Sequence, residues 1–161
     1  MKKVFVTRKL LKENEKKLKE LFDVKLNSND KIYSAAEIIE GSKNFDGILS
    51  SVTDPINSET ISKLSSSIKI IANGAVGFGN IDIKAAREKG ITVTNTPDVL
   101  TDATADIQIL LLLGASRKAY EGRIEAETQS WKWSWDFLLG KQMSNKRLGI
   151  LGMGRIGRAV A

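Results

Sequence analysis

Short β-rich runs alternate with helical segments over the first 95 residues, and this alternation constrains the fold more than any other feature. Runs rich in Val, Ile, Phe and Thr predict strands at 4–7, 24–26, 45–51, 67–73 and 91–95. Helices are predicted between them, at 9–22, 34–41, 58–64 and 81–90. The first has Leu11, Leu18, Leu21 and Phe22 on its apolar side, and the second begins with a capping box of Ser34 and Glu37. Strands and helices that alternate at this spacing form βαβ units with right-handed crossovers. The sequence therefore predicts an α/β fold with one doubly wound parallel sheet.

The pattern changes after residue 96, where we place the boundary of the first domain. Thr101 or Asp102 is predicted to cap a long helix that is apolar on nearly every side. Such a helix is typical of an element buried between layers or between subunits. Residues 130–145 form an irregular segment with three tryptophans, and RLGIL at 147–151 is predicted to open a second sheet.

The composition excludes several kinds of chemistry. The chain has 161 residues, 42% of them apolar, which suffices for one ordinary domain with a core. It has no cysteine, which excludes disulfides and thiolate metal sites. It has no histidine, so neither a Ser–His nor a Cys–His nucleophile can form.

Charge and hydropathy bear on the partners. The formal net charge is +6, but the lysines of 9–22 alternate with glutamates, as on a solvated helix face, so we expect no nucleic-acid partner. A nucleic-acid binder would instead show steeply salt-dependent binding to any duplex. The most apolar run, ILLLLGA at 109–115, is far shorter than the roughly 20 residues that span a bilayer. The N-terminus has no signal-peptide pattern, so we expect a cytoplasmic protein without a membrane partner.

A glycine-rich turn, GMGRIG at 152–157, lies between the predicted strand 147–151 and a helix-forming RAVA. In a G-x-G-x-x-G turn the first glycine permits the tight turn and the second lets the backbone approach a pyrophosphate. The third allows close packing of helix and strand. The first N–H groups of the helix then face the phosphates. This context predicts the start of a dinucleotide site.

A second glycine-rich loop, GAVGFGN at 74–80, follows a predicted buried strand. The N–H groups of Val76 and Gly77 can form an anion nest there, because open α/β sheets bind ligands at the carboxyl ends of strands. The alternative is a plain strand-to-helix connection, in which the glycines only ease turning and Asn80 caps the next helix. SSVTD at 50–54 can line the same crevice, or it can be only a helix-capping turn before Pro55.

Three stretches together resemble the D-2-hydroxyacid dehydrogenase family, and most closely its glyoxylate/hydroxypyruvate reductase branch. They are residues 68–106, the W-x-W-x-W-x-F-L-L-G pattern at 131–140, and LGILGMGRIGRAVA at 148–161. In that family a Rossmann cofactor domain interrupts a flavodoxin-like substrate domain, and the active site lies between the two. The resemblance implies a substrate domain at 1–96, a linking helix and dimerisation arm at 97–145, and the start of the cofactor domain at 146–161.

The resemblance also implies roles for individual residues. The substrate carboxylate would be held by Val76 and Gly77, and the substrate would be bordered by Ser51 and Val52. NAD or NADP would be held by residues of the linking helix and the glycine-rich turn: Thr104, Gly152, Gly154, Arg155, Ile156 and Gly157. Trp133 would reach into the active site of a homodimer partner, or would be only an aromatic anchor at the interface. The family commonly has proline at the position of Trp135, so this chain departs from the pattern of the arm.

The implied reaction is NAD(P)H-dependent reduction of a small 2-keto acid, glyoxylate or hydroxypyruvate, to a D-2-hydroxy acid. The family's arginine, glutamate and histidine lie downstream of the position of Ala161, so we expect no catalytic residue in this chain. Residues 1–161 are then expected to be an N-terminal part of the enzyme and inactive alone. The alternative is a non-catalytic module that binds a small acid or dimerises.

Overall fold

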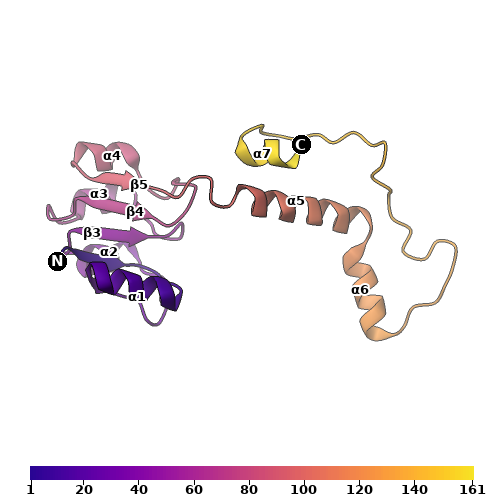
Figure 1. Cartoon of the computed structure of the whole chain (residues 1–161), viewed down its shortest axis with the longest axis horizontal. Helices are drawn as coiled ribbons and strands as arrows, with labels where there is room; N and C mark the ends of the chain where they lie inside the picture. Colours follow the sequence, from indigo (N-terminus) through magenta and orange to yellow (C-terminus); the bar gives the residue numbers. More distant parts are fainter. The chain divides into compact units, whose positions relative to one another are not determined.

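Five parallel strands form one sheet in the first part of the chain (Figure 1). The strands are β1 Lys3–Val6, β2 Asp23–Lys25, β3 Gly47–Ser50, β4 Ile70–Asn73 and β5 Thr92–Thr94. Their order in the sheet is β2-β1-β3-β4-β5, which is the doubly wound flavodoxin-like order. The computed structural model describes all residues 1–161, in two compact units, Met1–Val99 and Leu100–Ala161. The predicted fold class is confirmed for the first unit.

The register of the strands determines where the loops gather. In the central pair, Gly47 lies opposite Ile70 and Ser50 opposite Asn73, so β3 and β4 end together. Because all the strands are parallel, the loops that follow them leave from one edge of the sheet. Both loops that the sequence suggests as ligand sites, at 50–54 and 74–80, therefore start at the same edge.

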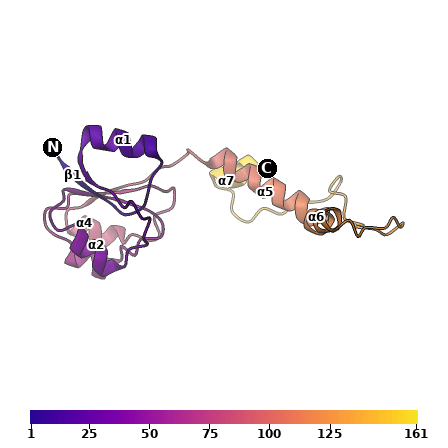
Figure 2. The same cartoon turned by 90° about the horizontal axis from the view of Figure 1, so that it is seen from below.

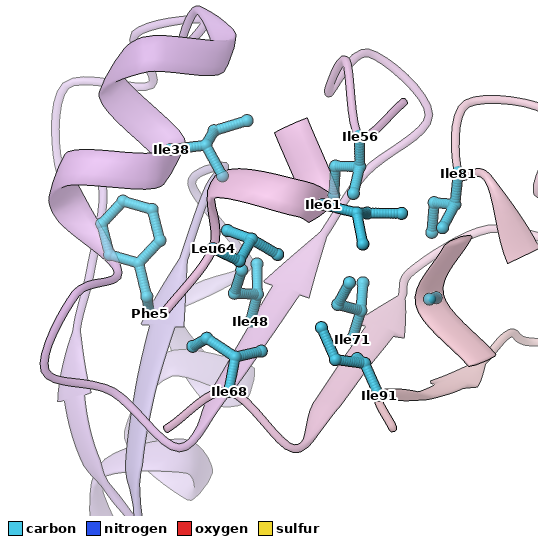
Figure 3. Close-up of a cluster of buried hydrophobic side chains, with 11 residues drawn as sticks. Phe5, Ile38, Ile48, Ile56, Ile61, Leu64, Ile68, Ile71, Ile81 and Ile91 are labelled. Carbon is cyan, nitrogen blue, oxygen red and sulfur yellow. The ribbon is translucent and has the colours of Figure 1, made fainter. Parts of the chain in front are cut away.

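Helices cover the two faces of the sheet unequally. The helices α2 Ala35–Gly41 and α4 Ile83–Glu88 lie on one face, and α1 Lys12–Leu21 lies on the other (Figure 2). The helix α3 Ser58–Lys63 packs against both α2 and α4. On the first face, isoleucines of the strands and helices form the core (Figure 3), and the ring of Phe5 stacks on Tyr33 with centroids 5.6 Å apart. On the other face, Leu18 and Phe22 border an apolar groove of about 370 Å³ over the strands. Leu11 and Leu21, predicted for the apolar side of this helix, are exposed.

The ends of the short helices follow from local sequence. Ser34 and Glu37 form the predicted capping box of α2. Asp82 caps α4 by accepting the N–H of Ala85, so the interpretation of Asn80 as the cap is wrong. Gly90, with φ of +73°, ends α4 in a Schellman motif, in which the N–H of Ile91 donates to the carbonyl of Ala86 at 2.8 Å.

The second unit contains α5 Thr101–Ser116, α6 Ala119–Thr128 and α7 Arg155–Val160, with α7 packed along α5 (Figure 1). The residue before α5 is Leu100, and no side chain caps the helix, so neither predicted cap forms. The burial expected of α5 is not found within this chain, since Ile107, Leu110 and Leu111 are exposed. Residues 147–151 form no strand, because a strand needs a hydrogen-bonded neighbour and the second unit supplies none. No helix is both long enough and apolar enough to cross a bilayer.

Candidate functional site

The loop after β4 presents a row of backbone N–H groups without partners. Gly74 and Ala75 donate to the carbonyls of Ser50 and Asn73, each at 2.8 Å. The N–H groups of residues 76–79 have no acceptor in the chain. No residue of this loop has a positive φ, so the row depends on successive bends rather than on a left-handed residue. Consecutive free N–H groups in a turn are suited to binding an anion.

Two side-chain amides donate hydrogen bonds to carbonyls of this loop. The Asn73 amide donates from Nδ2 to the carbonyl of Gly77 at 2.8 Å, and the Asn95 amide donates to the carbonyl of Val76 at 2.8 Å. Asn73 is buried, and its Oδ1 accepts the hydroxyl of Ser50 at 3.1 Å. Neither asparagine was identified from the sequence. Their positions could have indicated the role, since each asparagine stands where a predicted strand ends, and parallel strands end at one edge of the sheet.

The loop after β3 is fixed by a buried carboxylate. Asp54 accepts the hydroxyl of Thr7 at 2.5 Å and the N–H of Ser51 at 2.7 Å, both at Oδ2. Its other oxygen, Oδ1, is buried without a partner. The Asn80 amide donates to the carbonyls of Ser51 and Asp54, at 3.0 and 3.3 Å. The segment 50–54 is thus a braced loop, and the N-cap of α3 is Asn57 rather than a residue of this segment.

The two predicted substrate loops are connected through these side chains. Asn80 contacts the Ser51 carbonyl, and its Oδ1 lies 3.4 Å from the amide nitrogen of Asn73, which holds Gly77. Val52 is exposed at the tip of the first loop. Ser51, Val52, Val76 and Gly77 therefore share one edge of the sheet, and hydrogen bonds through Asn73 and Asn80 connect the two loops.

Arg8, a cation at this edge, is already paired. The guanidinium of Arg8 forms a bidentate ion pair with Asp30, with atoms 2.8 and 3.0 Å apart, and also donates to the hydroxyl of Thr53 at 3.0 Å. The hydrogen bond from Arg8, together with the N–H of Lys9, lowers the pKa of Asp30 from 3.8 to about 2. The charge of Arg8 is therefore compensated, whereas the N–H groups of residues 76–79 are free to meet an anion.

The glycine-rich turn in the second unit has the geometry that the motif requires. Gly152 has φ of +96°, a conformation that other residues rarely adopt. A Cβ on Gly157 would lie 2.1 Å from the Gly152 carbonyl oxygen, so only glycine fits there. A Cβ on Gly154 would meet nothing within 4 Å, which leaves open space at the position where a pyrophosphate would approach. Arg155 begins α7, and Ile156 lies in its first turn.

The other predicted residues of the second unit lie on α5 and in the aromatic segment. Thr104 is in the first turn of α5, where its N–H donates to the Leu100 carbonyl at 2.9 Å. Trp133 is exposed and packs edge-to-face against Trp135, with ring centroids 5.1 Å apart. No cluster of His, Cys, Asp or Glu in the chain is arranged to hold a metal ion.

Comparison with known proteins places these features in a family. Residues 4–134 match the catalytic domain of D-isomer specific 2-hydroxyacid dehydrogenases, and residues 109–161 match the NAD-binding domain of the same family. A glyoxylate reductase of Korarchaeum cryptofilum is 41% identical over 99% of this chain and 48% of its own length. A glycerate dehydrogenase of Hyphomicrobium methylovorum is 37% identical over 99% of this chain and 50% of its own length.

A solved structure agrees with the sequence matches. The crystal structure of a D-isomer specific 2-hydroxyacid dehydrogenase from Polaromonas has a TM-score of 0.89 and 39% identity, over 99% of this chain and 50% of that one. The chain therefore spans about half the length of the proteins it matches. The match to both domain models, together with this level of identity, shows that the chain belongs to the D-isomer specific 2-hydroxyacid dehydrogenase family.

Proposed function

We propose that this chain supplies the substrate-carboxylate loop and the pyrophosphate turn of an NAD(P)H-dependent reductase of small 2-keto acids, with glyoxylate and hydroxypyruvate as the substrates. The observation that carries the proposal is the row of free N–H groups at 76–79, in a chain of this family. The names of the relatives, glyoxylate reductase and glycerate dehydrogenase, support this substrate class.

The first unit binds the acid in this proposal. The N–H groups of Val76 and Gly77 donate to the substrate carboxylate, and Ser51 and Val52 border the rest of the small molecule. A hydrogen bond to a charged group contributes about 1.5–3 kcal/mol, so two such bonds account for binding in the millimolar range. Because the donors belong to the backbone, the loop recognises the carboxylate common to all 2-keto acids. Other contacts must select the rest of the substrate.

The second unit holds the cofactor in this proposal. The pyrophosphate lies over Gly154, where no atom of the chain occupies the space that a side chain would fill, and against the first turn of α7. Thr104 lies at the nicotinamide end of the cofactor. When bound, NADH or NADPH supplies the hydride that reduces the keto carbon.

The partner is a second copy of the chain in this proposal, with 97–145 as the linking helix and dimerisation arm. The support is the exposed apolar surface of α5, where Ile107, Leu110 and Leu111 are each more than half exposed. Trp133, also exposed, is the arm residue that reaches the partner.

We also propose that residues 1–161 alone do not turn over substrate. General acid–base help contributes about 10²–10⁴-fold to such a reaction, and the chain has no imidazole to supply it.

Titration of the isotope-labelled chain by NMR tests the proposal. Glyoxylate should shift the amide signals of Val76 and Gly77 at millimolar concentration. Glycolaldehyde, which replaces the carboxylate by a hydroxymethyl group, should leave them unchanged. Absence of a glyoxylate-specific shift would exclude the carboxylate loop. Steady NADH oxidation by the chain with glyoxylate would contradict its predicted inactivity, whereas binding without turnover is also the behaviour of a non-catalytic small-acid module.

A further inference from the structure

We propose that Asn95 and Asn73 are positioning residues that aim the backbone N–H groups of the loop at the substrate carboxylate. This inference rests on the proposed function, because it concerns the same loop. It adds what determines the direction of the donors, which the loop backbone alone does not fix.

The direction of each N–H follows from the geometry of the peptide bond. Every peptide bond in the chain is trans, and in a planar trans peptide the carbonyl of one residue and the N–H of the next point in opposite directions. A group that fixes a carbonyl therefore fixes the following N–H as well. Each peptide plane of the loop is therefore oriented by the group that binds its carbonyl.

Three consecutive carbonyls of the loop are each bound by a group from the body of the domain. The carbonyl of Ala75 accepts the N–H of Thr96 at 2.9 Å. The carbonyl of Val76 accepts the Asn95 amide, and that of Gly77 accepts the Asn73 amide, both at 2.8 Å. The N–H groups of Val76, Gly77 and Phe78 consequently point away from these groups, and none of the three has an acceptor in the chain.

Two of these three planes depend on side chains. No backbone N–H donates to the carbonyl of Val76 or of Gly77, so the asparagine amides are their only donors. The Asn73 amide cannot rotate freely, because its oxygen accepts the Ser50 hydroxyl at 3.1 Å while its nitrogen faces Gly77. Asn95 therefore orients the Gly77 N–H, and Asn73 orients the Phe78 N–H, which in this inference is a further donor to the carboxylate beside Val76 and Gly77.

The space beside the two glycines of the loop is open. A Cβ on Gly77 or on Gly79 would meet no atom within 4 Å. Packing therefore does not require glycine at either position, and the space that a side chain would take there is empty. Substitution of the asparagines by aspartate keeps the size of the side chain but replaces the N–H donor by an acceptor, which repels the carbonyl it faces.

The test uses the whole 161-residue chain with glyoxylate as the probe and NMR as the readout. The variants are Asn95→Asp and Asn73→Asp. The matched control is Asn27→Asp, because Asn27 is buried like Asn73 and its amide donates to two carbonyls, those of Thr7 and Lys31, each at 2.7 Å, away from the loop. Residual dipolar couplings report the directions of the Gly77 and Phe78 N–H bonds without ligand, and amide shifts report binding.

In Asn95→Asp we expect the Gly77 N–H direction to change, and in Asn73→Asp that of Phe78. Each variant should bind glyoxylate about tenfold more weakly or worse, which is the effect of losing one hydrogen bond to a charged group. Asn27→Asp should bind as the wild type does, even where its unfolding midpoint falls.

Two results would overturn the inference in distinguishable ways. If the wild type binds and both loop variants keep its affinity and N–H directions, the asparagines do not position the loop, and the proposed function stands. The same conclusion follows if Asn27→Asp loses as much affinity as they do. If the wild-type chain shows no shift at residues 76–78, the carboxylate site fails, and the inference fails with it.

Discussion

Replacement of Lys89 by methionine tests whether one side chain holds two helices of the first unit together. Lys89 ends α4, and its ammonium donates to three carbonyls at the end of α3: Ile61 at 2.7 Å, Ser62 at 2.6 Å and Leu64 at 2.6 Å. The carbonyls of Ser62 and Leu64 accept no backbone N–H, whereas that of Ile61 also accepts the Leu64 N–H at 3.1 Å. A cation at a helix C-terminus is also favoured by the helix dipole. Methionine keeps the aliphatic stem and removes only the charge and the donors.

The magnitude follows from the three contacts. A hydrogen bond to a charged group contributes about 1.5 kcal/mol at the lower end of the usual range, and three such bonds give about 4–5 kcal/mol. Fixing a lysine side chain costs up to about 2 kcal/mol of rotamer entropy. We therefore expect Lys89→Met to lower the free energy of unfolding by about 2 kcal/mol. For a domain of this size that corresponds to a fall in Tm of about 8–16 °C.

Urea unfolding followed by circular dichroism measures this loss. The matched control is Lys84→Met on the same helix, since Lys84 is exposed and its only partner is Glu88 at 3.9 Å. An exposed pair of this kind contributes less than about 0.5 kcal/mol. A loss below about 0.5 kcal/mol for Lys89→Met, or equal losses for the two variants, would refute the assignment of a stabilising role to the three carbonyl contacts.

Three further outcomes can be tested on the same chain. A hydrogen-bonded cation lowers the pKa of Asp30 from 3.8 and that of Glu37 from 4.5, each to about 2. The stability that these two ion pairs contribute is therefore complete above about pH 4.5 and is lost as the pH falls toward 2. In an acid titration, the free energy of unfolding should decline less steeply for Asp30→Asn than for the wild type. Gly157→Ala should displace the glycine-rich turn and its amide signals, because its Cβ would lie 2.1 Å from a carbonyl oxygen, whereas Gly154→Ala should leave them unchanged. If α5 is the dimer interface, Leu111→Lys should halve the mass found by light scattering, and an unchanged mass would place the interface elsewhere.

The parts of the fold that the sequence predicts correctly are those determined by local patterns. The capping box at Ser34 and the helix end at Gly90 depend on residues a few positions apart, and both are found. The sheet is found because strands and helices alternate with little ambiguity. The expected strand at 147–151 is absent for the opposite reason, since strand formation depends on a neighbour that no local pattern supplies.

The candidate site shows the same division. The glycines at 152 and 157 were identified because a positive φ and a close approach each require glycine, which a sequence motif records. Asn73, Asn95 and Asp54 were not identified, because their roles depend on which carbonyls and N–H groups the folded sheet brings within reach. A buried polar side chain at the end of a strand carries no motif, and its partner lies up to 47 residues away, as for Asp54 and Thr7.

The hydrogen bonds that hold the loop at 74–79 also bear on how tightly a small acid can bind. A flexible loop must lose conformational entropy when it closes on a ligand, at about 1–2 kcal/mol for each residue that becomes ordered. In this loop the carbonyls of Ala75, Val76, Gly77 and Phe78 are already hydrogen-bonded without ligand, so that ordering occurs during folding. A molecule of only a few atoms offers little binding energy, and a donor array that needs no rearrangement leaves nearly all of that energy available as affinity.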